Sequence, residues 1–223
     1  MEIINVRHTY RMLGNFINLL LNNEQRIKNM LLDYEIQTKV DKLPNGQEIK
    51  SLFFTNKNVI IKFTPINIEY EYNFIQPRLS DEEIYLKAKQ FYVLLGEIFP
   101  DVLGARVAFV RHSFIENDDG RVISDLTDKM GLTTQFGNCD ELAFRINTPV
   151  ESFESLNCVY DVNMGQAKNN KTNDVKKVLL LTIDVNTFIE KKDPRFNPYD
   201  FDNFFKPLLE ISIVKEEQMK KYI

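Results

Sequence analysis

The sequence predicts an α+β protein built on a mostly antiparallel sheet, with its helices packed on one face of the sheet. The clearest strand signal is residues 66–74, where apolar and polar side chains alternate without interruption, as in a strand with one buried face. The clearest helix signal is the segment 80–99, which opens with the capping-box pattern of Ser80 and Glu83. Further strand patterns precede and follow this helix, so strands and helices are mixed along the chain.

The chain begins with an expected strand around His8. A helical region is expected at about residues 10–32, because apolar side chains recur there at helical spacing. The pattern is interrupted near Asn22 and Asn23, which predicts a break in this helical region.

Four strands are expected next, at residues 34–40, 48–55, 58–63 and 66–74. The pairs Asn45-Gly46 and Asn56-Lys57 predict the turns of hairpins. Apolar residues of 66–74, Tyr70 and Tyr72 among them, are expected to face a core or a ligand. The residues of this strand expected to face water are Asn67, Glu69, Glu71 and Asn73.

The helix after these strands is expected to begin at Ser80 and to end near Phe99, since Pro100 follows. The second half then predicts a strand at 106–115, a short helix at 122–130, strands at 141–147, 157–166 and 178–186, and a closing helix from about Tyr199. With 58–63 and 66–74 taken as one strand that bends at Thr64-Pro65, each half has the order strand, helix, three strands, helix.

Two near-identical pentapeptides, residues 6–10 and 110–114, contain the two histidines, His8 and His112. Pro-Arg pairs at 77–78 and 194–195 each precede an expected helix. Together with the order of elements, these echoes predict an internal duplication with half-repeats 1–102 and 103–223, and chance similarity is the alternative. No linker separates the halves, so we expect one compact unit over residues 1–223.

The composition is that of a globular protein, with 43% hydrophobic residues and a net charge of −4. The acidic balance argues against a main role in binding nucleic acid, and we expect neither nucleic acid nor a membrane as partner. No secretion signal or membrane span is recognisable, which predicts a cytoplasmic location with Cys139 and Cys158 reduced. Phosphate loops, dinucleotide fingerprints and metal-site spacings are absent from the sequence, so no cofactor or metal is expected.

Asp161 and Asp184 are the best pair of candidate catalytic or ligand-binding carboxylates, because a hairpin could place them on opposite strands. Such a pair would need a cation, an arginine or a shared proton. Arg111, His112 or Arg145 could complete a site at the junction of the halves. The alternative is a register that leaves both aspartates on the wet face of the sheet.

Arg7 and His8 echo Arg111 and His112 and suggest a symmetric anion site, but neighbours on a strand point to opposite faces. Glu69-Tyr70-Glu71 resembles the paired glutamates of triphosphate-processing tunnel enzymes, although Asn73 stands where those enzymes want a lysine. A solvated strand face is the simpler interpretation. The basic loop of Lys168, Lys171, Lys176 and Lys177 is likewise typical of an exposed hairpin tip.

From about Val59 onward the chain resembles a sporadically distributed prokaryotic protein family of roughly this size, to which no activity is assigned. The resemblance rests on the aromatic strand 66–74, the arginine-containing strand 105–115, the segment 157–163, the strand around Asp184 and the closing helix. It implies one α+β unit and transfers no catalytic residue.

We therefore expect a non-catalytic protein-interaction module of bacterial or phage origin, which binds a protein partner or itself through a curved sheet with exposed aromatic positions such as Tyr70 and Tyr72. The bacterial or phage origin is inferred from abundant Asn and Lys and the absence of Trp. The patchy family suggests a role in phage–host conflict. The alternative is an enzyme or ligand-binding protein that uses Asp161 and Asp184, and its enzymatic activity is left open.

Overall fold

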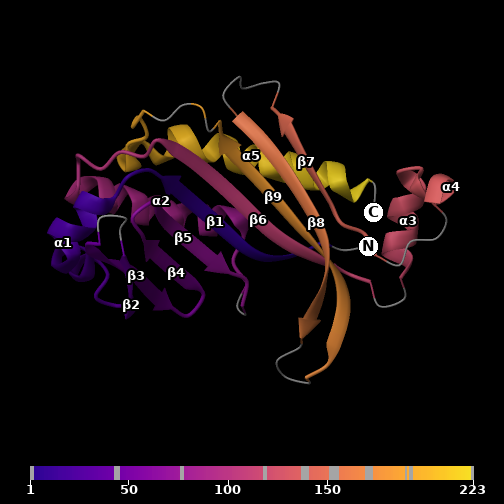
Figure 1. The fold of residues 1–223 in the computed structure, drawn as a ribbon, viewed down its shortest axis with the longest axis horizontal. Coiled ribbons are helices and arrows are strands. Elements are labelled where there is room, and N and C mark those ends of the chain that lie inside the picture. The colour runs from indigo at the N-terminus through magenta and orange to yellow at the C-terminus, as the bar shows by residue number, and fades with distance from the viewer. Residues whose placement is uncertain are drawn as a thin grey trace. The chain divides into compact units, whose positions relative to one another are not determined.

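The computed structural model describes residues 3–42, 46–75, 78–117, 120–136, 141–150, 156–168, 173–188, 190 and 193–221 (Figure 1). Nine strands form one antiparallel sheet in the order β2-β3-β4-β5-β1-β6-β9-β8-β7. The α+β class predicted from the sequence is therefore confirmed.

The strands are β1 (Ile4–Leu13), β2 (Glu35–Lys42), β3 (Glu48–Asn56), β4 (Val59–Phe63), β5 (Asn67–Asn73), β6 (Arg106–Glu116), β7 (Phe144–Pro149), β8 (Leu156–Lys168) and β9 (Val175–Thr187). The helices are α1 (Ile17–Met30), α2 (Asp81–Ile98), α3 (Arg121–Lys129), α4 (Leu132–Phe136) and α5 (Phe201–Lys220), with a 3₁₀ turn (Pro198–Asp200) before α5.

The chain divides into two compact units, each assembled from separate segments. Unit 1 comprises Met1–Val6, Val110–Val185 and Leu209–Ile223, and unit 2 comprises Arg7–Phe109 and Asn186–Leu208. Their boundaries fall inside β1, β6, β9 and α5, and the one nearest to residue 102 lies between Phe109 and Val110. The single compact unit expected from the sequence stays a prediction.

In unit 2, an aromatic core lies between β1, β5, α2 and the start of α5. The ring of Tyr10 is 4.8 Å from that of Phe109 and 5.6 Å from that of Phe205, and Tyr92 stacks on Phe201 at 5.4 Å. The Tyr92 hydroxyl lies 2.8 Å from the carbonyl oxygen of Tyr10 and 2.9 Å from that of Ile68. This hydroxyl therefore joins α2 to two adjacent strands.

Helix α2 begins as the sequence predicts. The Ser80 hydroxyl accepts a hydrogen bond from the Glu83 backbone N–H at 3.2 Å, and the Ser80 backbone N–H donates to the Glu83 carboxylate at 2.8 Å. This capping box satisfies donors that the first helical turn leaves unpaired. The helix ends at Ile98, with Phe99 as its C-cap.

The expected start of the first helical region is wrong. Residues up to Leu13 continue β1, because Tyr10 pairs with Tyr70 and Met12 with Ile68 across the sheet. The helix starts only at Ile17, and the predicted break is confirmed at Asn23, whose φ of −131° is not helical. Tertiary pairing with β5 thus overrides the local helical spacing.

The predicted duplication is not confirmed. Four strands lie between α1 and α2 in the first half, whereas three lie between α4 and α5 in the second. The two echoed histidines also differ in environment. His8 is fully buried, with its ring 4.7 Å from Phe74, whereas His112 is half-buried and hydrogen-bonds Thr182 at 3.1 Å.

Candidate functional site

The structure places most of the predicted site residues in unit 1. Arg145 on β7 pairs directly with Asp161 on β8, and its Nη1 atom is 3.3 Å from the Asp161 carboxylate. The Arg145 side chain is 67% exposed. An ion pair this exposed contributes little to stability, about 0–1 kcal/mol. Asp184 lies half-buried on β9.

Arg111 and His112 lie in different environments, as alternation along a strand requires. Arg111 is buried and forms an ion pair with Glu216 of α5 at 3.1 Å. His112 contacts Thr182 instead. A ligand role for these two residues, with Asp161, Asp184 and Arg145, stays a prediction.

No cluster of three or more His, Cys, Asp or Glu side chains suited to a metal ion occurs among the residues that the structure describes. Cys158 is a free, buried cysteine, and burial raises the pKa of its thiol to about 11. Cys139 and Lys171 lie outside the described residues. Lys168, Lys176 and Lys177 are exposed, as expected, and Lys176 pairs with Glu116 at 2.7 Å.

Tyr70 and Tyr72 are each 2% exposed, so they do not supply exposed aromatic surface, and their expected role in binding stays a prediction. They lie on β5, which has β4 and β1 as neighbours and is not an edge strand. Their side chains point to the side of the sheet that α2 covers, and Tyr70 lies 5.9 Å from Phe91 of that helix. Both tyrosines therefore lie between the sheet and α2, on the inward side that the alternation predicts.

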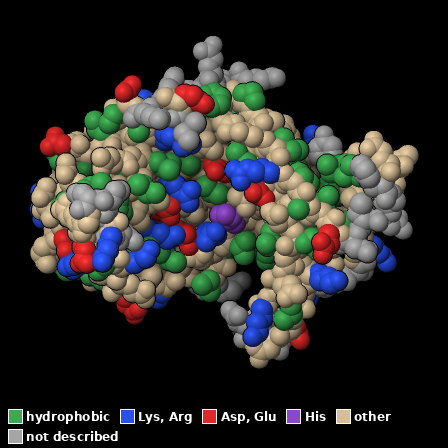
Figure 2. Space-filling view, viewed as in Figure 1, with side chains coloured by type: hydrophobic (Ala, Val, Ile, Leu, Met, Phe, Trp, Pro, Cys, Tyr) green, Lys and Arg blue, Asp and Glu red, His purple; other side chains and the backbone are tan. Residues whose placement is uncertain are grey.

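The other face of β5 also differs from the expectation. Glu69 and Glu71 do not face water, because each side chain is only 5% exposed. In Figure 2, basic and acidic side chains gather over β1, β4 and β5 on the face turned to the viewer. The five residues Arg7, Arg11, Lys62, Glu69 and Glu71 are called the charged cluster below.

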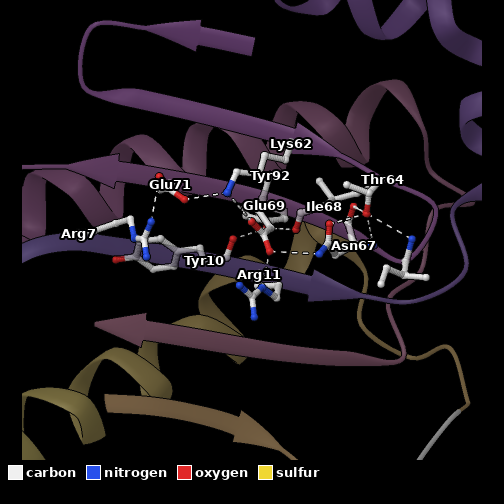
Figure 3. Close-up of polar contacts among 11 residues, drawn as sticks. Arg7, Tyr10, Arg11, Lys62, Thr64, Asn67, Ile68, Glu69, Glu71 and Tyr92 are labelled. Carbon is white, nitrogen blue, oxygen red and sulfur yellow. Dashed lines mark hydrogen bonds and ion pairs between the residues drawn. The ribbon is translucent and has the colours of Figure 1, made fainter. Parts of the chain in front are cut away.

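Strand register brings the charged cluster together (Figure 3). Arg11 of β1 and Lys62 of β4 both pair with Glu69, one from each side of β5. The Nε atom of Arg11 donates to Glu69 at 2.5 Å. The Nζ atom of Lys62 is 3.2 Å from Glu69 and 2.9 Å from Glu71. Arg7 is further away, with its Nη1 atom 3.7 Å from Glu71.

Charges within this cluster shift the pKa values of Glu71 and Lys62. Burial alone would raise the pKa of Glu71, but the hydrogen bond from Lys62 and the charges of Lys62 and Arg7 outweigh burial and lower it. Burial would likewise lower the pKa of Lys62, but its bonds to Glu71 and Glu69 outweigh burial and raise it. Both groups are therefore charged at neutral pH.

A signal for the charged cluster was present in the sequence. Arg7, Thr9 and Arg11 alternate along β1 as Glu69 and Glu71 do along β5. Opposite charges on two alternating strands indicate that the strands are neighbours. What the sequence does not contain is the order of strands, which places β5 between β4 and β1.

The edge of the sheet in unit 2 is β2, which pairs only with β3. Every β2 side chain whose burial the structure describes is exposed, on both faces of the strand. Ile36 is 41% exposed and Val40 is 53% exposed. Exposed edge strands present unpaired backbone groups that can accept another strand.

Comparison of the chain with models of protein families, with curated proteins and with solved structures finds no match. Within the described part of the chain, no helix has both the length and the apolar character needed to cross a bilayer.

Proposed function

We propose that this chain is a non-catalytic protein-interaction module that pairs through β2 with a strand of another polypeptide. The observation that carries the proposal is the exposure of β2 at the edge of the sheet. This strand of 8 residues has one neighbouring strand and is exposed on both faces. Strand addition uses the backbone hydrogen bonds of such an edge for affinity and alternate side chains for specificity.

The sequence of β2 fits a second copy of itself. An antiparallel pairing centred on Thr38 would place Ile36 of each chain opposite Val40 of the other. Gln37 would then face Lys39, while Glu35 of each chain would face Asp41 of the other, so like charges meet only at the two ends of the pairing. A two-fold axis relates the two contacts, as in most homodimers. Apolar β-branched pairs across strands are favourable.

The test is the mass of the purified protein in solution, by native mass spectrometry and by light scattering over a concentration series. We expect a dimer for the wild type. The double variant Ile36→Lys, Val40→Lys should be monomeric, because lysine on an edge strand opposes pairing. The matched control is Ile66→Lys, since Ile66 is 66% exposed and lies outside the strands. A wild-type monomer at the highest soluble concentration, or a dimer that survives the double variant, would overturn the proposal.

The expected origin, location, family and biological role of the protein rest on the sequence alone. Bacterial or phage origin, a cytoplasmic location, membership of the sporadic prokaryotic family and a role in phage–host conflict stay predictions. A site of Asp161 and Asp184 would lose metal or ligand binding in Asp161→Asn or Asp184→Asn without unfolding.

A second candidate function is anion binding at the charged cluster. The Nε atom of Arg7 is buried and hydrogen-bonds none of the described residues, although the side chain as a whole is 39% exposed. Three basic side chains also face only two carboxylates. A phosphate or carboxylate group could bind Arg7 and balance the extra charge, because guanidinium groups bind such oxyanions through paired hydrogen bonds.

Titration with inorganic phosphate and pyrophosphate, followed by calorimetry, tests this second candidate. We expect binding that weakens at least several-fold in Arg7→Gln. Arg145→Gln is the matched control, because Arg145 also faces one carboxylate from an exposed position. Equal affinity in both variants and the wild type would count against the charged cluster as an anion site.

A further inference from the structure

Unit 2 contains a cavity of about 570 Å³ on the side of the sheet that α2 covers. It lies among the end of α1, the turn between β3 and β4, strand β5 and one side of α2. The volume lies within the range typical of small-molecule sites. The charged cluster is on the opposite face of β5, so this cavity is a separate feature.

The walls of the cavity are largely apolar and aromatic. Ile61 and Tyr70 contribute from the sheet, Leu31 from the end of α1, and Phe91 and Leu94 from α2. All of these except Leu94 are buried, with at most 6% of their surface exposed. The cavity therefore offers a ring or a short acyl chain an apolar surface that the fold has already assembled.

Three tyrosines, Tyr34, Tyr70 and Tyr72, also line the cavity. The Tyr72 hydroxyl accepts a hydrogen bond from Asn58 at 3.1 Å. In contrast, the hydroxyls of Tyr34 and Tyr70 donate to no atom of the described chain, although Tyr70 is only 2% exposed. The Tyr70 hydroxyl is not among the fully buried polar atoms that lack a partner, so it is open to the cavity, where a polar group of a ligand could accept its hydrogen bond.

Two exposed lysines complete the lining, Lys57 from the turn between β3 and β4 and Lys87 from α2. Neither has a carboxylate within ion-pair distance in the described part of the chain. Lys57 adopts a left-handed conformation with φ of 47°, which is uncommon for a residue other than glycine. A two-residue hairpin loop requires such a residue, so the turn between β3 and β4 fixes the position of Lys57 at the edge of the cavity.

We propose that this cavity binds a small amphipathic organic acid, with its apolar body against Phe91 and Ile61 and its anionic group held by the Tyr70 hydroxyl and by Lys57 or Lys87. Burial, together with the nearby Tyr34 and Tyr72, raises the pKa of Tyr70. The Tyr70 hydroxyl therefore keeps its proton at neutral pH and can donate it in a hydrogen bond to a carboxylate, phosphate or sulfonate.

Fluorescence titration with two dyes tests the proposal. Anilinonaphthalene sulfonate combines an aromatic body with an anionic group, and phenylnaphthylamine has the same rings without the sulfonate. We expect the sulfonate dye to bind with a stoichiometry of one per chain and to bind several-fold more tightly than the neutral dye, because only the sulfonate can use Tyr70 and the lysines.

The variants Tyr70→Phe and Lys87→Gln should each weaken the sulfonate dye several-fold and leave the neutral dye unchanged. Tyr70→Phe keeps the ring, and circular dichroism of each variant checks its folding. Lys177→Gln is the control, because Lys177 is an exposed lysine of unit 1.

Several results would overturn the proposal. These are no binding of either dye, binding of several dyes per chain, equal affinity for both dyes, and unchanged affinity of the sulfonate dye in both variants. The double variant Ile36→Lys, Val40→Lys should keep full dye binding, because neither residue lines the cavity. A monomer that still binds the sulfonate dye would contradict only the strand-pairing proposal. A dimer that does not bind the dye would contradict only the cavity proposal.

Discussion

Glu71 shows how individual residues of the charged cluster depend on one another. Its carboxylate is almost fully buried and stays ionised because Lys62 donates to it at 2.9 Å and Arg7 lies nearby. Removal of one partner of a buried pair is costly, since the remaining charge loses its compensation. The cost falls where the remaining charge can reach water, and the Lys62 side chain is 27% exposed.

We therefore expect Glu71→Gln to lower the free energy of unfolding by about 1–3 kcal/mol. Urea denaturation measures this change. The matched control is Asp161→Asn, which removes a half-exposed partner of the exposed Arg145 and should cost less than about 1 kcal/mol. Similar costs for both substitutions would show that the cluster is no more tightly coupled than a surface ion pair.

Tyr92 gives a second prediction at the residue scale. Its buried hydroxyl reaches the carbonyl oxygens of Tyr10 and Ile68, which belong to adjacent strands (Figure 3). Tyr92→Phe should lower the free energy of unfolding by about 1–2 kcal/mol, because it leaves these groups without that donor. In Tyr85→Phe, the lost bond is an exposed one to Asp202, so a smaller effect is expected. Equal effects in chemical denaturation would contradict this account.

The sequence predicts which residue types alternate but not what covers them. Alternation along residues 66–74 correctly predicts that Tyr70 and Tyr72 face a core. It predicts the wrong environment for Glu69 and Glu71, because their burial comes from Arg11 and Lys62 on neighbouring strands. Side chains from outside the strand decide the burial of its polar face, and a single strand pattern has no information about them.

At the scale of elements, local signals predict the fold wherever the deciding contacts are local. The start of α2 is correct because Ser80 and Glu83 contact each other within one turn. The last three strands and the closing helix are also found, although β7 begins at Phe144, later than expected. The sequence does not predict helix α4. It also ends the first strand too early, because the last residues of β1 are held in the sheet by pairing with β5.

The N-terminal cap of α2 supports a prediction at this scale. Ser80→Ala removes the hydroxyl that accepts from the Glu83 backbone N–H, and should lower the free energy of unfolding by about 1 kcal/mol. Ser124→Ala is the control, because Ser124 is exposed in the interior of α3, where alanine favours the helix. The midpoint temperature of unfolding should therefore fall in Ser80→Ala, and it should rise or stay unchanged in Ser124→Ala.

At the scale of the whole molecule, the sequence cannot predict how the chain divides. Each unit is assembled from segments that are distant in sequence, and unit 2 takes in residues 186–208 as well as Arg7–Phe109. The aromatic core of unit 2 shows why, since Phe201 and Phe205 pack on Tyr10 and Tyr92. Non-local packing of this kind has no periodic signature within either segment.

The stability of the whole protein should form a plateau between an acid and an alkaline limit. The pKa of Glu71 is lowered from 4.5, so its stabilising effect is present above that value and is lost as the pH falls through the folded-state pKa. The pKa of Lys62 is raised from 10.5, so its effect is present below that value and is lost as the pH rises through the folded-state pKa. Burial also raises the pKa of Tyr70 and of Tyr92 from 10.0, which adds to the loss on the alkaline side.

Unfolding free energies measured across the pH range, for the wild type and for Glu71→Gln, test this expectation. A protonated glutamic acid and a glutamine are both neutral, so the advantage of the wild type should shrink as the pH falls below about 4.5. The advantage should be constant between about pH 6 and 9, where Glu71 and Lys62 both stay charged. An advantage that persists unchanged into strong acid would mean that the shape of Glu71, and not its charge, stabilises the charged cluster.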